Sequence, residues 1–549
     1  MSVISDPVIQ KAVANIKQRS EKQRDIQKSL ESFVDLGVIP QIATENNQIV
    51  YGRRGTGKTH LFNYLGAELS KTPQAKVVYI DCRTLGSSSQ FSDFTLPIEH
   101  RCLALFKDIL AEVHDALLER IIETPTQHAN EVLDLLSRLE AAVMQPIVDR
   151  RIGSLSSKVQ SGSEDLISLG LTGKPVEVSV NLGFQTKKSS ATEKVINESV
   201  VYSDKVIFPA INNLLRAICE KADLLLFILL DEWSSLPIDI QPYLAEFIKR
   251  GFLPVNTVTV KIASLEYRSN FSIKTPLAGL LGLEVGADIA TGMDLDDHYV
   301  FDRNKDRVTK AFADILYNHV RSEVPEDYLQ SKYGITDSDK FVTTFFTNST
   351  TSFQELARAA EGVARDLINI FTHAFFTSQR KEHSKIEKRT ITEAAQQWFE
   401  QDKARELAPE LSQALRRIVE EVIGKKKARS FMVPKELEGN ELLQRLFDSR
   451  VLHLVMRGYA DKDNPGVRYN IYTLDYGTYV SLLGTSKSPE GFEDKSVVDA
   501  DFVVPFDDRR SIRRIILTSE VLHPGEQLLF TVEASPERLE QSHQSPDES

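Results

Sequence analysis

Residues 52–59 read Gly-Arg-Arg-Gly-Thr-Gly-Lys-Thr, which matches the pattern G-x-x-x-x-G-K-[ST] at every fixed position. The preceding residues 48–51 favour a strand, and the apolar spacing of residues 61–69 is that of a helix. A glycine-rich turn between a strand and a helix lets backbone N–H groups surround a phosphate, and the helix N-terminus adds its positive dipole end. The stretch therefore predicts an α/β fold with a phosphate-binding loop.

The loop and the first turn of its helix supply the candidate nucleotide-binding residues. These are Gly52, Arg53, Arg54, Gly55, Thr56, Gly57, Lys58, Thr59 and His60. We expect the Lys58 ammonium to lie against the β and γ phosphates and the Thr59 hydroxyl to ligate Mg²⁺. Upstream, Phe33 and Ile39 are candidates for contact with the adenine, because a segment before such a loop often covers the base.

A second stretch, residues 224–232, reads Leu-Leu-Leu-Phe-Ile-Leu-Leu-Asp-Glu. Seven apolar residues are too few to cross a bilayer and suit a strand that is buried on both faces. We expect Asp231 to be the second metal-binding side chain and Glu232 to be the base for a water that attacks the γ phosphate. Alternatively, Glu232 only caps the following turn. The cofactors implied are ATP and Mg²⁺.

Length and composition indicate several domains. The chain has 549 residues, with 41% apolar and 26% charged residues and a formal net charge of −12. Its three cysteines, Cys82, Cys102 and Cys219, have neither zinc-site spacing nor the even number of a disulfide framework. The first residues lack the plan of a signal peptide. These features favour a cytoplasmic protein with no membrane partner.

Periodicity predicts the order of the elements. Residues 7–35 are expected to be helical, residues 76–83 to form a strand that completes a βαβ unit, and residues 258–264 and 298–301 to form further strands of a parallel sheet. Residues 176–182 alternate as one arm of a hairpin. The expected organisation is an N-terminal helix (1–30), an ATPase core (31–83 and 206–320), an insertion of helices and a mobile β-hairpin (84–205), a helical lid (321–403), a winged helix-turn-helix (404–485), a C-terminal extension (486–534) and a disordered tail (535–549).

The winged helix is predicted from three helices followed by two strands, at 452–457 and 468–474. Residues 403–480 carry 14 Lys and Arg against 11 Asp and Glu, a net +3 in an acidic chain. In such domains one helix enters the major groove and the wing contacts the backbone. The candidate DNA-binding residues are Lys425, Lys426, Lys427, Arg429, Arg445, Arg450, Lys462 and Arg468. The basic run at 424–429 could equally be a solvated loop.

The acidic pair, the strand order and a separate helical lid resemble the AAA+ class of ATPases. Residues 361–370, Glu-Gly-Val-Ala-Arg-Asp-Leu-Ile-Asn-Ile, resemble the G-x-A-R-x-x-x-x-L lid signature of the origin-recognition initiator (ORC/CDC6-like) family. The likeness extends over about residues 30–483, as in a bacterial-type member with a large insertion. It implies that Arg365 reaches from the lid to the γ phosphate. The alternative for Arg365 is an exposed arginine that pairs with Glu361.

Two further roles follow from the resemblance. The family usually has an asparagine sensor after the strand that follows the acidic pair. Here that position holds Ser264, with Glu266 just beyond it. An arginine finger that completes a neighbouring subunit's site could be Arg250 or Arg268, and each could instead be a plain surface arginine.

The sequence thus predicts an ATP-binding and ATP-hydrolysing switch, slow in turnover, that couples its nucleotide state to binding of double-stranded DNA. Self-association is expected, because such sites are often completed by a neighbour. The alternative is a nucleotide-controlled sensor or scaffold that docks proteins, for example in antiviral defence, without touching DNA. In that case the insertion or the winged helix would contact the protein partner.

Overall fold

The computed structural model describes residues 2–17, 25–86, 93–144, 147–152, 198–203, 206–275, 279–300, 304–426, 428–460, 466–478 and 515–523. The chain divides into two compact units. The first is Met1–Asp402 with Asp475–Ser481, and the second is Lys403–Leu474 with Leu482–Ser549. Among the described residues, no helix combines the length and the apolar run that crossing a bilayer requires.

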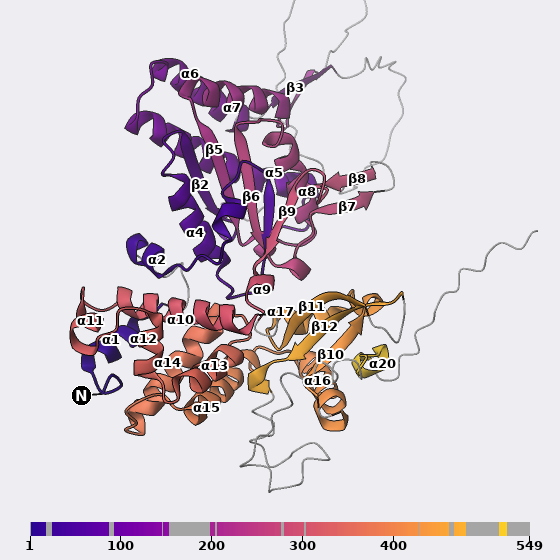
Figure 1. Cartoon of the computed structure of the whole chain (residues 1–549). Coiled ribbons are helices and arrows are strands. Elements are labelled where there is room, and N and C mark those ends of the chain that lie inside the picture. Colours follow the sequence, from indigo (N-terminus) through magenta and orange to yellow (C-terminus); the bar gives the residue numbers. More distant parts are fainter. Residues whose placement is uncertain are drawn as a thin grey trace, which may run out of the picture. The chain divides into compact units, whose positions relative to one another are not determined.

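A five-stranded parallel sheet forms the centre of the first unit (Figure 1). Its strand order is β2-β5-β6-β1-β9, with bounds β1 (Gln48–Tyr51), β2 (Ala75–Asp81), β5 (Leu225–Asp231), β6 (Val258–Ser264) and β9 (Ala290–Asp294). The register pairs Asp81 with Asp231 and Tyr51 with Ser264, so the carboxyl ends of these strands lie at one edge. This confirms the α/β fold class predicted from the sequence.

The strand predicted at residues 298–301 is wrong. The fifth strand is β9, and His298 instead ends a short helix, α9 (Leu295–His298). Gly292 lies within β9, where a Cβ would come within 3.0 Å of Gln48 Cβ and 3.1 Å of the Ile49 carbonyl oxygen. Close approach to β1 requires glycine at this position, and a glycine interrupts the alternation of apolar residues that predicts a strand. The sequence pattern therefore did not indicate β9.

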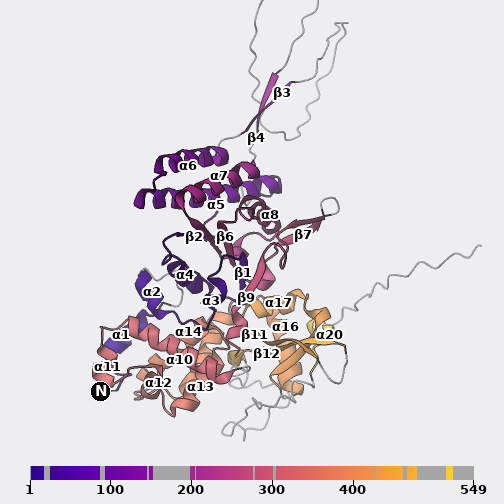
Figure 2. The same cartoon turned by 45° about the horizontal axis from the view of Figure 1, so that its top comes forward.

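Helices cover both faces of the sheet. One face carries α5 (Ile98–Glu123), α7 (Phe208–Ala222) and α8 (Gln241–Gly251), with α6 (Ala129–Met144) packed on α5 and α7 (Figure 2). The other face carries α3 (Ile39–Ile42) and α4 (Lys58–Leu69). Thus α5 and α6, which the sequence placed in an insertion, share the hydrophobic core of the sheet.

Two further pairs of antiparallel strands lie outside this sheet. They are β3 (Ile147–Ile152) with β4 (Glu198–Ser203), and β7 (Ser272–Thr275) with β8 (Gly279–Gly282). None of these four strands was predicted from the sequence. The hairpin arm expected at 176–182 lies outside the described residues.

A bundle of helices follows the sheet in the first unit, and we refer to it as the lid. Its helices are α10 (Lys305–Ser322), α11 (Tyr328–Tyr333), α12 (Ser338–Phe345), α13 (Ser349–Ala359), α14 (Ala364–Arg380) and α15 (Lys388–Trp398). Glu361 and Gly362, with φ of 47° and 81°, turn the chain between α13 and α14. A Cβ at Gly362 would lie 2.8 Å from the Tyr299 carbonyl oxygen, so this turn requires glycine.

The second unit combines helices with a small antiparallel sheet of order β10-β12-β11. Its elements are α16 (Pro409–Val419), the π-helical turn Glu420–Lys425, β10 (Ser430–Pro434), a 3₁₀ turn (Lys435–Leu437), α17 (Glu441–Asp448), β11 (Leu452–Ala460), β12 (Arg468–Leu474) and α20 (Ser519–Leu522). The sequence predicted the last two sheet strands but not β10. After Leu474 the chain returns to the first unit, where the Tyr476 hydroxyl donates to Glu355 Oε1 of α13 at 2.5 Å.

The helical stretch predicted for residues 7–35 forms two helices, α1 (Pro7–Asn15) and α2 (Ile26–Ser32), and residues 18–24 between them lie outside the described residues. α2 contacts α4 and α10, and α1 contacts α10 and α14. Asp6, 1% exposed, fixes α1 to α11, because its carboxylate accepts hydrogen bonds from Tyr328, Lys332 and Tyr333 at 2.7–2.9 Å. Asp6 therefore holds α1 against the lid, and we refer to Asp6 with α1 as the N-terminal clasp.

Burial alone would raise the pKa of Asp6, but hydrogen bonds from Lys332, Tyr333, Tyr328 and the Val8 amide lower it to about 2. Because the pKa is lower in the folded state than in the unfolded state, its stabilisation is complete above about pH 4 and is lost as the pH falls toward 2. We expect Asp6→Asn to lower the free energy of unfolding at pH 7 by about 2 kcal/mol, since it removes the charge from a buried hydrogen-bonded carboxylate. Urea unfolding of both proteins should show this difference shrinking at pH 3.

The exposed N-cap Asp337 of α12 offers a matched control, because asparagine caps a helix as well as aspartate does. Asp337→Asn should change the free energy of unfolding by only a few tenths of a kcal/mol. A loss for Asp6→Asn as small as that of Asp337→Asn would contradict the role of the clasp.

Candidate nucleotide-binding site

The loop at residues 52–59 joins β1 to α4 in the conformation its glycines permit. Gly55 and Gly57 have φ of 86° and 101°, in the left-handed region that favours glycine. The Thr56 hydroxyl donates to the Arg53 carbonyl at 2.9 Å. The Lys58 ammonium, 7% exposed, donates to the carbonyls of Gly52 at 2.7 Å and Arg53 at 3.1 Å. The lysine side chain thus folds back over the loop at the N-terminus of α4.

Charged side chains from three parts of the chain act on Lys58. Burial lowers its pKa, the carboxylates of Glu232, Asp231 and Asp296 oppose this, and the Arg365 guanidinium lowers it further. Lys58, the acidic end of β5, Asp296 and Arg365 are therefore close enough to act on one another electrostatically.

Asp231 is fully buried at the end of β5, and both of its carboxylate oxygens are held. The Tyr79 hydroxyl donates to Oδ2 at 2.8 Å, and the Glu232 amide donates to Oδ1 at 2.8 Å. Burial, followed by the charge of Asp231, raises the pKa of Tyr79, so Tyr79 stays a proton donor. Each carboxylate oxygen keeps a further lone pair that could bind a hard cation such as Mg²⁺.

Sequence reasoning missed Tyr79. Tyr79 lies on β2, beside β5, and β2 pairs in register with β5 up to Asp81 and Asp231. Nothing in the local sequence distinguishes this tyrosine from an ordinary strand residue. Only the pairing of two strands that are about 150 residues apart reveals the contact.

Glu232 and Ser264 occupy the same edge of the sheet. Glu232 has φ of 55°, an uncommon conformation for a residue with a side chain, and its Oε2 lies 3.5 Å from the Ser235 hydroxyl. The Ser264 side chain is fully buried, and its hydroxyl is hydrogen-bonded to the Ser269 hydroxyl. Ser264 is thus engaged with the turn after β6.

A buried ion pair ties the loop to the residues before the lid. Arg53 donates from its backbone amide and from Nε to the two oxygens of Asp296 at 2.8 and 2.9 Å, and from Nη2 to the Glu361 carbonyl at 3.3 Å. Both side chains are less than 10% exposed. The Arg53 side chain, predicted to bind nucleotide, therefore joins the loop to α9 and to the turn before α14. Its partner Asp296 carried no signal in the sequence.

The lid contacts the loop through its backbone as well. The Arg365 amide donates to the Gly55 carbonyl at 3.0 Å. A Cβ added at Gly55 would lie 2.8 Å from Arg365 Cβ and 3.1 Å from Val363 Cγ1. The absence of a side chain at Gly55 therefore allows the first turn of α14 to rest on the loop.

Other predicted residues lie elsewhere. His60 Nε2 is 2.6 Å from the Ser29 carbonyl of α2, and burial lowers the pKa of His60. Arg54 is exposed.

Ile39 is buried in the core with α4, which leaves Phe33 as the candidate for the adenine contact that lies nearer the surface. Arg250 is more than half exposed and pairs with Glu246 at 2.5 Å, whereas the Arg268 carbonyl accepts a hydrogen bond from Gln241.

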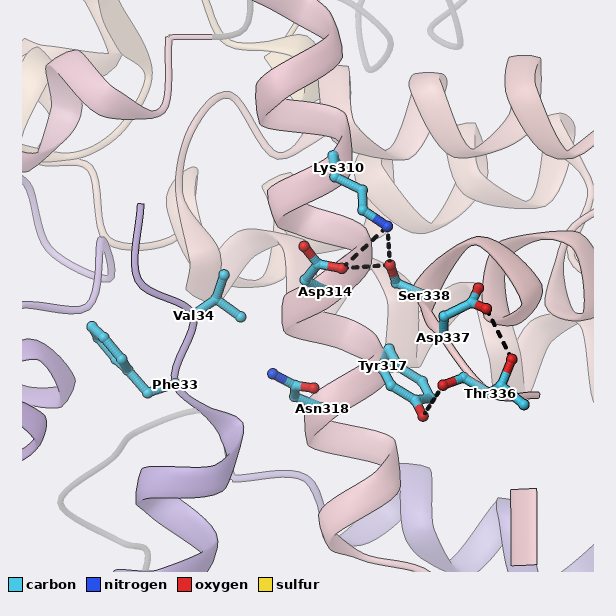
Figure 3. Close-up of a pocket in the computed structure, with 9 residues that line it drawn as sticks. All are labelled: Phe33, Val34, Lys310, Asp314, Tyr317, Asn318, Thr336, Asp337 and Ser338. Carbon is cyan, nitrogen blue, oxygen red and sulfur yellow. Dashed lines mark hydrogen bonds and ion pairs between the residues drawn. The ribbon is translucent and has the colours of Figure 1, made fainter. Parts of the chain in front are cut away.

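Phe33 stacks on Tyr64, with ring centroids 4.3 Å apart, and borders a pocket of about 350 Å³ (Figure 3). The other lining residues come from residue 34, from α10 and from residues 336–338. Lys310 donates to the Ser338 hydroxyl at 2.7 Å, and the Tyr317 hydroxyl donates to the Thr336 carbonyl at 3.1 Å. No residue of the phosphate-binding loop lines this pocket.

The predicted DNA-binding residues differ widely in exposure. Arg429 and Arg450 are each only 5% exposed, and Arg429 Nε donates to the Leu474 carbonyl at 2.9 Å. Arg445 lies between two carboxylates, those of Glu410 at 2.5 Å and Glu441 at 3.5 Å.

The remaining candidates lie closer to solvent. Lys425 and Lys426 are exposed, and Lys425 pairs with Glu421 at 2.7 Å. Arg468 is exposed and donates to the Gly458 carbonyl at 3.2 Å. Lys427 and Lys462 lie outside the described residues.

The order of the sheet strands, β2-β5-β6-β1-β9, defines the class of the fold. The first unit has the fold of an AAA+ ATPase. Residues 19–87 match the model of the ORC-CDC6-like family, which confirms the resemblance stated from the sequence. No curated protein matches the chain in sequence.

Solved structures of this family resemble the chain. Cdc6p of Pyrobaculum aerophilum is 10% identical with a TM-score of 0.27, and the match covers 87% of this chain and 95% of that one. ORC2 of Aeropyrum pernix, in ADPNP and ADP complexes, is 10% identical with a TM-score of 0.31, covering 87% and 96%. Drosophila ORC bound to DNA is 10% identical with a TM-score of 0.29, covering 87% and 92%. At these scores the class rests on the strand order and the site.

The contact between the loop and the lid can be tested with two glycines. Gly55→Ala should displace α14, because its Cβ meets Arg365, whereas Gly57→Ala meets nothing within 4 Å and introduces only backbone strain of about 1 kcal/mol. Hydrogen exchange of residues 363–370 should be at least ten-fold faster in Gly55→Ala than in Gly57→Ala. Equal protection in both variants would show that the lid does not rest on Gly55.

Proposed function

We propose that the chain binds ATP with Mg²⁺ at residues 52–59 and hydrolyses it slowly, as a switch. The observation that carries this proposal is the buried Lys58 ammonium, held at the N-terminus of α4 in the field of Asp231, Glu232 and Arg365. An anionic ligand with a bound metal ion would account for these positive and negative charges around a glycine-rich turn.

Each residue has a role in this reaction. Lys58 and the loop amides hold the phosphates, and Thr59 and Asp231 hold Mg²⁺, which would offset phosphate charge. Glu232 takes the proton of a water whose oxygen bonds to the γ phosphorus, while the bond from that phosphorus to the β–γ bridging oxygen breaks and its electron pair leaves with ADP. Arg365 stabilises the charge on the γ phosphate oxygens.

The switch acts through the lid. The Arg53 side chain donates to the Glu361 carbonyl and the Arg365 amide donates to the Gly55 carbonyl, so the loop is connected to the turn after α13 and to the first turn of α14. A γ phosphate that attracted the Arg365 guanidinium would alter these two hydrogen bonds. The lid would therefore change its position with the nucleotide state. Either Arg250 or Arg268 would complete the site of a second copy.

Two substitutions separate binding from chemistry. Lys58→Ala should weaken ATP binding by at least 100-fold, whereas Glu232→Gln should keep ATP bound and lower turnover by at least 100-fold, because only the base is lost. Binding of a fluorescent ATP analogue and release of phosphate would measure the two effects. An equal loss of binding in both variants would refute the assigned roles.

We propose further that the second unit is a winged helix-turn-helix that binds double-stranded DNA, with α17 as its recognition helix. Lys425, Lys426 and Arg468 support this proposal, because they are exposed and belong to the basic part of an acidic chain. Phosphate contacts of this type supply affinity that depends strongly on salt.

A salt titration tests the DNA contact. Lys425→Glu combined with Lys426→Glu should lower DNA affinity and reduce the slope of log K against log salt by about two, since two phosphate contacts are lost. Lys388→Glu with Arg389→Glu in α15 imposes the same change of net charge on an exposed lid helix. An equal loss in both double variants would contradict a specific contact.

The second candidate function, docking of a protein partner under nucleotide control, is favoured by the same unit. Arg445, in α17, pairs with Glu410 and Glu441, and Arg429 and Arg450 are buried, so these three arginines offer little charge to a DNA phosphate. A partner that co-purifies after nuclease treatment only with ATP would support docking.

A further inference from the structure

A segment from far along the chain covers one edge of the sheet in the second unit. β10 is the edge strand, and residues 515–517 lie beside it in parallel. The Met432 amide donates to the Ile515 carbonyl, and the Leu517 amide donates to the Met432 carbonyl, both at 2.8 Å. An extended peptide adds a strand to a sheet edge by this pattern of hydrogen bonds.

The side chains of the segment alternate as a docked strand requires. Ile515 and Leu517 are 2% and 1% exposed, whereas Ile516 between them is 39% exposed. The chain then turns into α20, which packs on α16 (Figure 1) and buries Leu522 to 1% exposure. Three apolar side chains, at the first, third and eighth positions of the segment, therefore enter the body of the unit.

Polar side chains of the unit contact the other end of the segment, Arg417 at its backbone and Asn440 at a side chain. Arg417 of α16 donates from Nε to the Val521 carbonyl at 2.8 Å and from Nη2 to the Leu522 carbonyl at 2.6 Å. Asn440 Nδ2, at the N-cap of α17, lies 3.0 Å from His523 Nε2. Because Arg417 recognises main-chain carbonyls, any peptide that ends in such a turn could satisfy it.

The balance of forces makes this docking reversible. Burial of three apolar side chains and the hydrogen bonds to Met432 and Arg417 favour the docked state, and the loss of conformational freedom of nine residues opposes it. Covalent connection to the same chain raises the local concentration of the segment and tips the balance toward docking. A segment held in this way can leave without unfolding the sheet.

We propose that the β10 edge, Arg417 and Asn440 form a peptide-docking site, which we name the β10 groove, and that residues 515–523 are its resident ligand. When the segment leaves, the groove takes a peptide of a partner protein with the same chemistry: two apolar residues separated by one exposed residue, then a short helical turn with a third apolar residue. This inference rests on the protein-docking function proposed above and names the site and the peptide that it takes.

Hydrogen exchange of the unmodified full chain tests whether the segment opens by itself. The Leu517 amide should exchange at least 100-fold faster than the amides of β12, because it is protected only while the segment is docked. Exchange of Leu517 at the rate of β12 would mean that the segment opens only with the whole unit, and would overturn the proposal.

A labelled synthetic peptide with the sequence of residues 515–523 tests the groove directly. It should bind at least ten-fold more tightly to the full chain carrying Leu517→Asp and Leu522→Asp than to the unmodified chain, because these substitutions displace the resident segment. Adding Arg417→Ala to that variant should abolish the gain. Equal binding to all three chains, measured by fluorescence anisotropy, would refute the groove.

A matched peptide isolates the backbone contact. N-methylation at the position of Leu517 keeps every side chain but removes the N–H that donates to the Met432 carbonyl. This peptide should bind at least ten-fold more weakly than its parent, and equal affinity would show that no strand is added to β10. None of the three experiments contains nucleotide or DNA, so failure here is distinct from failure of the ATPase or the DNA contact.

Discussion

The buried Lys58 ammonium is the constraint on which the rest of the first unit depends. A cation removed from water is stable only if oxygen atoms and opposite charges surround it. The carbonyls of Gly52 and Arg53 supply direct hydrogen bonds, and the carboxylates of Asp231 and Glu232 supply the field. The sheet can bring the carbonyls and the carboxylates to Lys58 only if its parallel strands end at the same edge. The charge of the site therefore depends on the register of the strands.

Other side chains of the first unit preserve this arrangement. The Arg53–Asp296 ion pair is buried, and leaving either charge alone would cost several kcal/mol, so loop and α9 stay together. Tyr79 orients Asp231 from the neighbouring strand. The N-terminal clasp at Asp6 holds α1 on the lid, while α2 lies between α4 and α10. Loop, lid and N-terminus are thus connected through particular side chains.

The features that sequence could predict are those that local chemistry determines. Residues 52–59 and the acidic end of β5 are contiguous motifs, and β6 is a run of β-branched residues whose bounds match the prediction. Tyr79, Asp296 and Asp6 were missed because their partners lie from about 150 to more than 300 residues away. β9 was missed because Gly292 breaks its pattern. The sequence shows that Arg429 and Arg450 are charged, but it does not show that both are buried, because their burial depends on packing in the folded unit.

The path of the chain between its two units has a consequence of its own. The polypeptide enters the second unit after Asp402 and returns to the first at Asp475, where Tyr476 is anchored against α13. It enters the second unit again at Leu482, so three covalent connections join the units, and a protease that cuts one of them leaves the other two intact. Separation of the second unit from the first therefore requires three cleavages, and a chain cut once would still migrate as a single particle until it was denatured.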